Sequence, residues 1–219
     1  MGDRSRSSQT IELAPETTGS TIRSWARFYD AVGWLMTFGK ASAMRKETVA
    51  LAQPAAGEKV LDVGCGTGTD AIALRAKVGP GGEVVGIDAA PEMISVARSK
   101  AAKRGADIDF RVGLIEEIPF PDDCFDLVLS SFMLHHLPDD VKGKGLAEIR
   151  RVLKPGGRFL AVDLTIHGHS FVGHVMTLLG HGERGQATGL RAIIDDAGFG
   201  EVEILESKFK QLAFVRALP

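Results

Sequence analysis

The stretch that decides the fold is KVLDVGCGTGTD, residues 59–70. Apolar residues surround Asp62, and every second residue that follows is a glycine: Gly64, Gly66 and Gly68. This pattern predicts a short buried strand, a tight glycine turn and a helix that begins near Thr69 or Asp70. Glycine is needed where φ is positive or a ligand approaches the main chain, and the helix start offers N–H groups to that ligand. A plain strand–turn–helix is the alternative, but it requires neither Asp62 nor three alternating glycines.

The glycine spacing separates two kinds of nucleotide site. A dinucleotide site has the spacing G-x-G-x-x-G, whereas this chain has G-x-G-x-G, which disfavours a dinucleotide oxidoreductase. The sequence contains no G-x-x-x-x-G-K-[ST], so a P-loop is not supported. The turn instead resembles motif I of the class I S-adenosylmethionine (SAM) dependent methyltransferases.

A second acidic residue, Asp88, follows an apolar strand predicted over residues 83–87. It lies about 20 residues beyond the glycine turn, where an acid at the end of the second strand binds ribose hydroxyls. The alternative is an aspartate that only caps the next helix, which we expect to begin at Pro91. Met93 follows within one turn of that helix and is placed to pack on the adenine face.

Further motifs extend the resemblance from Trp25 to Leu164. W-x-x-x-Y-D at 25–30 and L-K-P-G-G-R-F at 153–159 look like segments of the ubiquinone and menaquinone C-methyltransferase-like enzymes (methyltransferase domain type 11). The resemblance implies a Rossmann-like α/β fold: a seven-stranded, mostly parallel sheet with helices on both faces, an antiparallel last strand and an N-terminal helical cap. It also implies SAM as cofactor, S-adenosylhomocysteine (SAH) as product, and Tyr29 over the cofactor.

One position departs from the family pattern. The aspartate that usually accepts from the adenine amino group is replaced here by Leu114. Glu116 is one substitute, and the backbone N–H of Ile115 is another. The cofactor-binding residues expected from the turn and the resemblance together are Tyr29, Asp62, Gly64, Cys65, Gly66, Gly68, Asp88, Ala89, Met93, Leu114, Ile115, Glu116 and Ser131.

The order of patterns along the chain predicts one domain. Residues 1–20 lack any period and are expected to form a flexible tail, and residues 21–219 form a single methyltransferase domain. Within it we expect a helical cap over 21–53, a SAM-binding core over 54–164, and a substrate-side segment with closing strands over 165–219. Helices are predicted over 21–38, 41–52, 69–78, 91–104, 139–153 and 187–197. The remaining strands are predicted over 107–112, 125–131, 158–164, 202–206 and 211–217.

Histidines follow two strands at the predicted active edge of the sheet. His135 follows the strand that ends at Ser131, and His167 and His169 follow the strand that ends at Leu164. An imidazole titrates near neutral pH, so each of these three is a candidate general base for an acceptor that must lose a proton. The alternative is a structural role, because L-H-H-L runs in the resembling family often lack a catalytic one. The spacing of histidines and cysteines does not support a metal site.

Composition narrows the classes of partner. The 219-residue chain has a formal net charge of −2, with 44% hydrophobic and 25% charged residues, so nucleic-acid binding is not expected. Cys65 and Cys124 do not make a disulfide framework. No signal peptide and no run near 20 apolar residues is present, so we expect a cytoplasmic protein without stable membrane insertion. A homodimer stays open.

The function expected is methyl transfer from SAM by in-line displacement to a small, hydrophobic acceptor, with O-, C- or N-methylation all open. Because the sulfonium methyl is already a good electrophile, such an enzyme mainly orients the reactants and excludes water. The alternative is a non-catalytic regulatory module that binds SAM or another nucleotide, and Leu114 is the feature that favours it.

Overall fold

The computed structural model describes residues 30, 34–35, 37, 39–164 and 185–219, with the side chains of 185–188 left out. The tail expected over 1–20 and most of the helix expected over 21–38 lie outside the described residues, as do Tyr29, His167 and His169. Among the described residues, no helix has the length and apolar character to cross a membrane.

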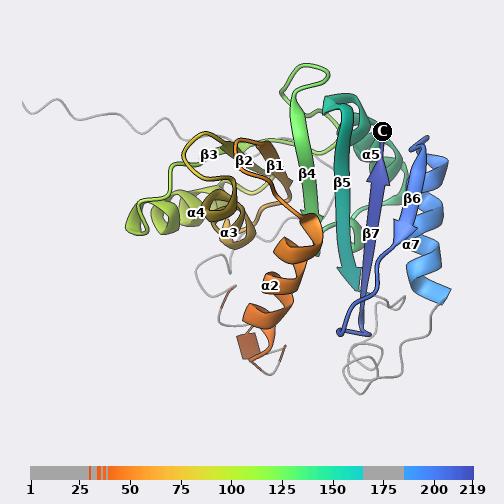
Figure 1. The fold of residues 1–219 in the computed structure, drawn as a ribbon, viewed down its shortest axis with the longest axis horizontal. Coiled ribbons are helices and arrows are strands. Elements are labelled where there is room, and N and C mark those ends of the chain that lie inside the picture. The colour runs from red at the N-terminus through yellow and green to blue at the C-terminus, as the bar shows by residue number, and fades with distance from the viewer. Residues whose placement is uncertain (1–29, 31–33, 36, 38, 165–184) are drawn as a thin grey trace, which may run out of the picture.

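A seven-stranded sheet runs through the described chain in the order β3-β2-β1-β4-β5-β7-β6 (Figure 1). All neighbouring pairs from β3 to β5 are parallel, and β7 is antiparallel to both of its neighbours, β5 and β6. The predicted mostly parallel sheet with an antiparallel last strand is therefore confirmed. The strands are β1 (Lys59–Val63), β2 (Glu83–Asp88), β3 (Asp109–Val112), β4 (Phe125–Ser131), β5 (Leu153–Leu164), β6 (Glu201–Ile204) and β7 (Leu212–Leu218).

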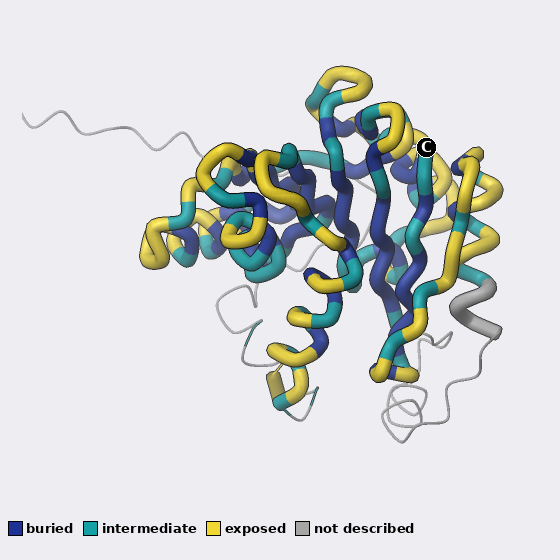
Figure 2. Tube along the Cα trace, in the orientation of Figure 1, coloured by how far each residue is buried: buried dark blue, intermediate teal, exposed yellow. Residues whose placement is uncertain are grey.

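Helices cover both faces of the sheet because alternate residues of the central strands are apolar on each face. The first core packs α2 (Ala41–Ala52), α3 (Thr69–Val78) and α4 (Pro91–Lys103) against one face, and Val60 of β1 belongs to it. The second core packs α5 (Asp139–Val152) and α7 (Gly185–Asp196) against the other face, with Leu61 of β1. Figure 2 shows the central strands as the most deeply buried part of the fold.

The segment 154–157 differs from the prediction. We expected L-K-P-G-G to end a helix and precede a strand at 158, but β5 already begins at Leu153, which pairs with Phe125. The register shifts between Phe125 and Leu127, and Gly156 has φ +81°. Glycine therefore lets the chain form an irregular extension of the strand instead of a separate loop.

The carboxyl ends of β1, β4 and β5 meet at one edge, since these strands are parallel neighbours. The glycine turn follows β1, Ser131 ends β4, and a 3₁₀ helix, η1 (Leu134–His136), comes next. Phe132 joins β4 to η1 with φ +56°, an unusual value for a residue with a side chain. Met133 then packs so closely on the turn that a Cβ at Gly64 would lie 2.5 Å from its Cγ. The fold thus brings η1 next to the glycine turn.

Candidate functional site

The three glycines of the turn have different tasks. All have positive φ, +73° at Gly64, +52° at Gly66 and +72° at Gly68. A Cβ at Gly68 would lie 2.6 Å from Cζ of Phe110, so this glycine lets α3 pack closely in the core, as Gly64 does for Met133. No atom of the described residues would lie within 4 Å of a Cβ at Gly66. Gly66 therefore faces open space, where a ligand can approach the main chain.

Asp88 lies beside this open position. Its Oδ2 accepts a hydrogen bond of 2.9 Å from the Gly66 N–H, and its Oδ1 accepts one of 2.9 Å from the Ala90 N–H before α4. Ala90 is the N-cap residue of α4, and no described side chain caps this helix, so Asp88 is free of simple capping duty. Its carboxylate instead joins the glycine turn to the residue that precedes the helix. Burial raises the pKa of Asp88, and these two N–H groups oppose the shift. Ala89 follows Asp88, and Met93 is buried beside Ala90.

A buried acidic pair lies behind the turn. Burial, with the nearby Asp70 carboxylate, raises the pKa of Asp62 well above the usual range of aspartate. Burial also raises the pKa of Asp70, whose Oδ1 lies 3.5 Å from Nε of Arg45. Among the described residues, Asp62 Oδ2 is buried and lacks a hydrogen-bond partner. An orphaned carboxylate oxygen beside an open glycine fits a ligand that carries positive charge, as the sulfonium and ammonium groups of SAM do.

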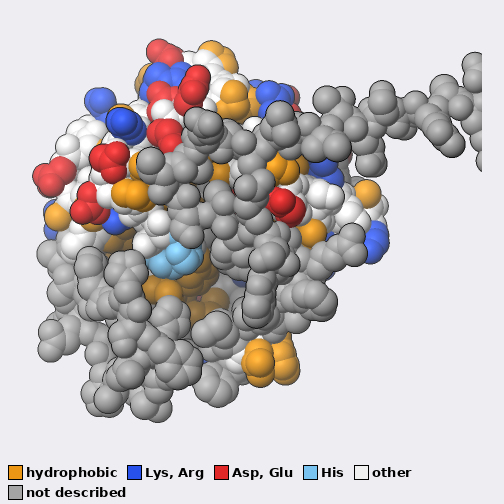
Figure 3. All heavy atoms as spheres, turned by 180° about the vertical axis from the view of Figure 1, so that it is seen from behind, with side chains coloured by type: hydrophobic (Ala, Val, Ile, Leu, Met, Phe, Trp, Pro, Cys, Tyr) orange, Lys and Arg blue, Asp and Glu red, His pale blue; other side chains and the backbone are white. Residues whose placement is uncertain are grey.

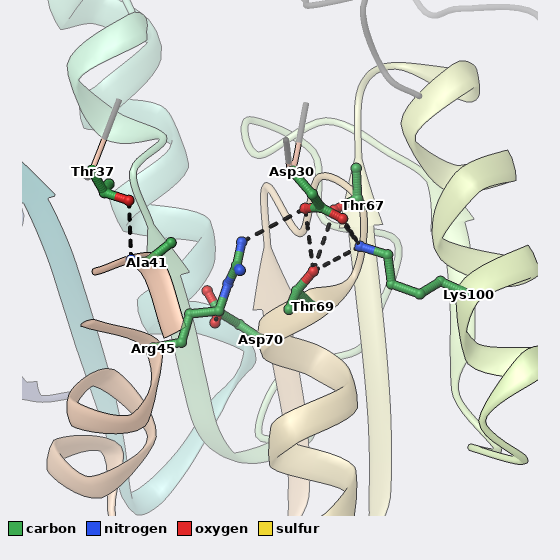
Figure 4. A network of polar contacts seen from close by, with 8 residues as sticks. All are labelled: Asp30, Thr37, Ala41, Arg45, Thr67, Thr69, Asp70 and Lys100. Atoms are coloured by element: carbon green, nitrogen blue, oxygen red, sulfur yellow. Dashed lines mark hydrogen bonds and ion pairs between the residues drawn. The ribbon is translucent and has the colours of Figure 1, made fainter. Parts of the chain in front are cut away.

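Asp30 connects the N-terminal part of the chain to the turn (Figure 4). It accepts a hydrogen bond of 2.8 Å from Oγ1 of Thr67 and forms an ion pair with Lys100 of α4. Lys100 also donates to Thr67 and Thr69, at 2.8 and 2.7 Å. Burial lowers the pKa of Lys100. Burial alone would raise the pKa of Asp30, but the hydrogen bonds from Lys100 and Thr67 outweigh it and lower that pKa below its usual value. We call Asp30, Thr67, Thr69 and Lys100 the Asp30 clasp.

The segment that departs from the family pattern makes a tight bend. Leu114 forms a short antiparallel bridge with Glu117, and Ile115 is buried against Gly145 of α5. Leu114 also lines an open pocket of about 730 Å³, together with residues that include Pro119, Phe120 and Arg151. The leucine therefore occupies an apolar place at the end of β3, and Ile115 faces the core.

Cys65 lies within the turn and is buried. Burial, with nearby carboxylates, raises the pKa of its thiol well above the usual value. The thiol therefore stays protonated near neutral pH, which suits a small packing residue and not a nucleophile.

His135 lies in η1 at the carboxyl edge of β4 and β5. Its backbone N–H donates to Asp163 Oδ2 at 2.8 Å, and its ring Nδ1 forms a very short hydrogen bond with Oδ1 of the same carboxylate. The ring of His136 packs on it with 3.8 Å between centroids. Figure 3 shows the described histidine side chains beside a hollow that hydrophobic side chains floor. His135 is thus the one of the three candidate bases that the structure describes, and it is paired with the buried Asp163.

The sequence did not single out Asp163, Arg45 or Lys100. Asp163 had a usable signal, because it precedes the end of a strand at the predicted active edge. Arg45 and Lys100 had none, since they reach the turn from helices 25 and 31 residues away in sequence from Asp70 and Thr69. Asp62, Gly64, Gly66, Gly68 and Asp88 do converge at one edge, as the prediction required.

Comparison with known proteins gives this arrangement a family. Residues 60–157 match the family described as "Methyltransferase domain". Residues 60–157 thus form part of a methyltransferase domain. The chain is 39% identical to a demethylmenaquinone methyltransferase of Thermus thermophilus over 135 residues, which cover 62% of this chain and 60% of that protein. It is also 42% identical to a ubiquinone/menaquinone biosynthesis C-methyltransferase of Xanthomonas campestris over 149 residues, which cover 67% of this chain and 58% of that protein.

A solved structure shares the whole fold of the methyltransferase domain. A SAM-dependent methyltransferase from Aquifex aeolicus superposes with a TM-score of 0.67 and 25% identity, over 90% of this chain and 98% of that one. The chain spans about 60% of the length of the curated relatives it matches. The domain, its Rossmann-like fold and its cofactor class are thus established, and the acceptor is a separate question.

The first prediction concerns Asp88. We expect Asp88→Ala to weaken SAM binding by about 1.5–3 kcal/mol, because a charged acceptor for ribose hydroxyls is lost. Titration calorimetry with SAM and SAH measures this loss. Asp88→Asn is the control, since it keeps the size and one acceptor oxygen. Affinity within twofold of wild type for Asp88→Ala would remove Asp88 from the site.

Proposed function

We propose that this protein transfers a methyl group from SAM to a small, hydrophobic acceptor. The observation that carries the proposal is the open backbone at Gly66, held by Asp88 and backed by the orphaned oxygen of Asp62. The relatives in Thermus and Xanthomonas are named for methylation of demethylmenaquinone and of quinone precursors, which are hydrophobic acceptors. The hydrophobic hollow beside the histidines supports the same acceptor class (Figure 3).

The residues of the chain would act mainly by positioning. When bound, SAM supplies a methyl carbon on a positively charged sulfur. Asp88 would accept hydrogen bonds from the ribose hydroxyls, and the main chain at Gly66 would contact the cofactor directly. Asp62 would face the positive charge of the cofactor. His135 would take a proton from an acceptor that has to lose one. This division of labour lets orientation provide most of the rate enhancement.

We also propose that residues 21–53 form a cap over the cofactor, which the Asp30 clasp holds on the turn. The clasp joins Asp30 to the two threonines that flank Gly68. Lids of this kind complete a site when they close. The half-buried ammonium of Lys100 contacts Asp30, Thr67 and Thr69 together.

Lys100→Met tests the clasp. We expect the variant to lose about 1 kcal/mol of stability near pH 7, since a charge-assisted contact to a partly exposed carboxylate is removed. The native pKa of Asp30 lies below its unfolded value, so its contribution is present above about pH 4 and falls as the pH drops through the native value. The stability difference between wild type and variant should therefore shrink on acidification.

Chemical denaturation at several pH values measures this difference, and SAM titration measures its effect on the site. Lys103→Met is the matched control, because Lys103 is an exposed lysine in the last turn of the same helix. A stability difference that stays constant between pH 7 and 3 would contradict the clasp.

The proposed function is tested by turnover. The protein is incubated with methyl-labelled SAM and a demethylmenaquinol in detergent, and with a soluble dihydroxynaphthalene as a second acceptor. Transfer of label to an acceptor, with one SAH formed per methyl group, is the expected result. Tight SAM binding without transfer to these acceptors or to any compound of a cell extract would favour the non-catalytic regulatory module.

A further inference from the structure

A single carboxylate holds both the main chain and the ring of His135. Asp163 Oδ2 accepts the His135 N–H at 2.8 Å, while Oδ1 faces ring Nδ1 and accepts the Leu164 N–H at 2.8 Å. Asp163 is buried at the end of β5, whereas 26% of the His135 side chain is exposed. The main-chain N–H groups of His135 and Leu164 therefore hold the carboxylate in place, and the carboxylate in turn holds the imidazole through Nδ1.

This arrangement selects one tautomer. An ionised carboxylate only accepts hydrogen bonds, so the proton of the neutral ring has to sit on Nδ1. Nε2 then carries the lone pair, on the side of the ring away from the buried acid. Because Met133 packs on Gly64, the loop that bears this lone pair is anchored to the glycine turn.

We propose that Asp163 is a positioning residue that holds His135 in the Nδ1–H form, with Nε2 as the base for the acceptor. This inference rests on the proposed function and deepens it by naming the acceptor class. A base near the acceptor is useful only where the acceptor carries a weakly acidic hydroxyl. Either the oxygen of that hydroxyl is methylated, or the hydroxyl is conjugated with the carbon that is methylated. A thiolate or a free amine does not need it.

The proposed step balances without a further reactant. The hydroxyl proton passes to Nε2, and the released electron pair, directly or through the conjugated ring, forms the bond to the methyl carbon. The carbon–sulfur bond breaks and its electron pair stays on sulfur, which becomes the neutral thioether of SAH. Where carbon is methylated, the ring loses its own proton afterwards and regains the hydroxyl. In either case one proton goes to solvent per turnover.

The tautomer can be read without any acceptor. The full chain labelled with ¹⁵N-histidine and saturated with SAH is studied by two-bond ¹⁵N–¹H correlation at about pH 8.5, where imidazoles are neutral. His136→Gln and His135→Gln assign the two neighbouring rings. We expect His135 in the Nδ1–H form, and population of the Nε2–H form in Asp163→Asn, whose amide can donate to Nδ1. A wild-type ring in the Nε2–H form would overturn the proposal, whether or not the variant folds.

Turnover provides the second reading. We expect Asp163→Asn to lower kcat for a hydroxylated acceptor by about 10- to 100-fold with SAM affinity unchanged. Asp163→Glu should restore part of kcat, because the carboxylate returns. Equal kcat in wild type and Asp163→Asn would overturn the positioning role, and faster methylation of thiols than of hydroxyls would overturn the acceptor class. If no acceptor is methylated, the proposed function fails, while the tautomer of His135 still shows whether Asp163 is a positioning residue.

Discussion

Gly66→Val is expected to bind SAM at least ~100-fold more weakly than wild type, a loss of about 2.8 kcal/mol. The valine side chain would project into the space beside the turn, where its Cβ would meet no atom of the described residues within 4 Å. The fold should survive, since the main cost is a non-glycine residue at φ +52°, about 1–3 kcal/mol. Titration calorimetry and thermal denaturation measure the two effects separately.

Gly68→Val is the matched control for this prediction. It carries the same side chain at a similar φ of +72°, but its Cβ would meet Phe110 at 2.6 Å and Ala97 at 2.9 Å. We expect it to lose stability far more than Gly66→Val, because the core cannot take the added volume. The two glycines would then be separated into a binding and a packing position. Normal SAM affinity in Gly66→Val would show that the whole turn is structural.

His135→Ala is expected to lower turnover of a hydroxylated acceptor by roughly 100-fold or more, with SAM affinity within twofold of wild type. The variant loses the ring that Asp163 holds at the edge of the site. Turnover at saturating acceptor and titration calorimetry with SAM measure the two effects separately.

His136→Ala is the control, because the ring of His136 packs on that of His135, and it is the His135 ring that bonds to Asp163. The double variant His167→Ala/His169→Ala examines the two candidates outside the described residues. Full turnover in His135→Ala together with a loss in the double variant would move the base to 167 or 169. Full turnover in every one of these variants would mean that the enzyme acts by orienting the reactants, without a histidine base.

The sheet and the position of the candidate cofactor site were predictable because local rules determine them. Strand ends, the helix start after Gly68 and Pro91 at the head of α4 follow from apolar periodicity, glycine and proline chemistry over short stretches. In parallel α/β sheets, the ends of such strands meet at one edge, so Asp62 and Asp88 had to converge there. The bulged start of β5 at Leu153 was missed because it depends on pairing with Phe125, a distant partner.

By itself, the sequence determined the order of elements, the glycine turn and the two acids that face it, because each of these depends on neighbours within a few residues. Only the tertiary structure decided what each residue does there. It assigned Gly68 to packing and Gly66 to open space, through the placement of Phe110. It gave Asp88 two N–H groups to hold, joined Lys100 to Asp30, and set Asp163 against His135. Apart from the bond between Ala90 and Asp88, those pairings span 22 to 70 residues, and no local pattern encodes a contact at that separation.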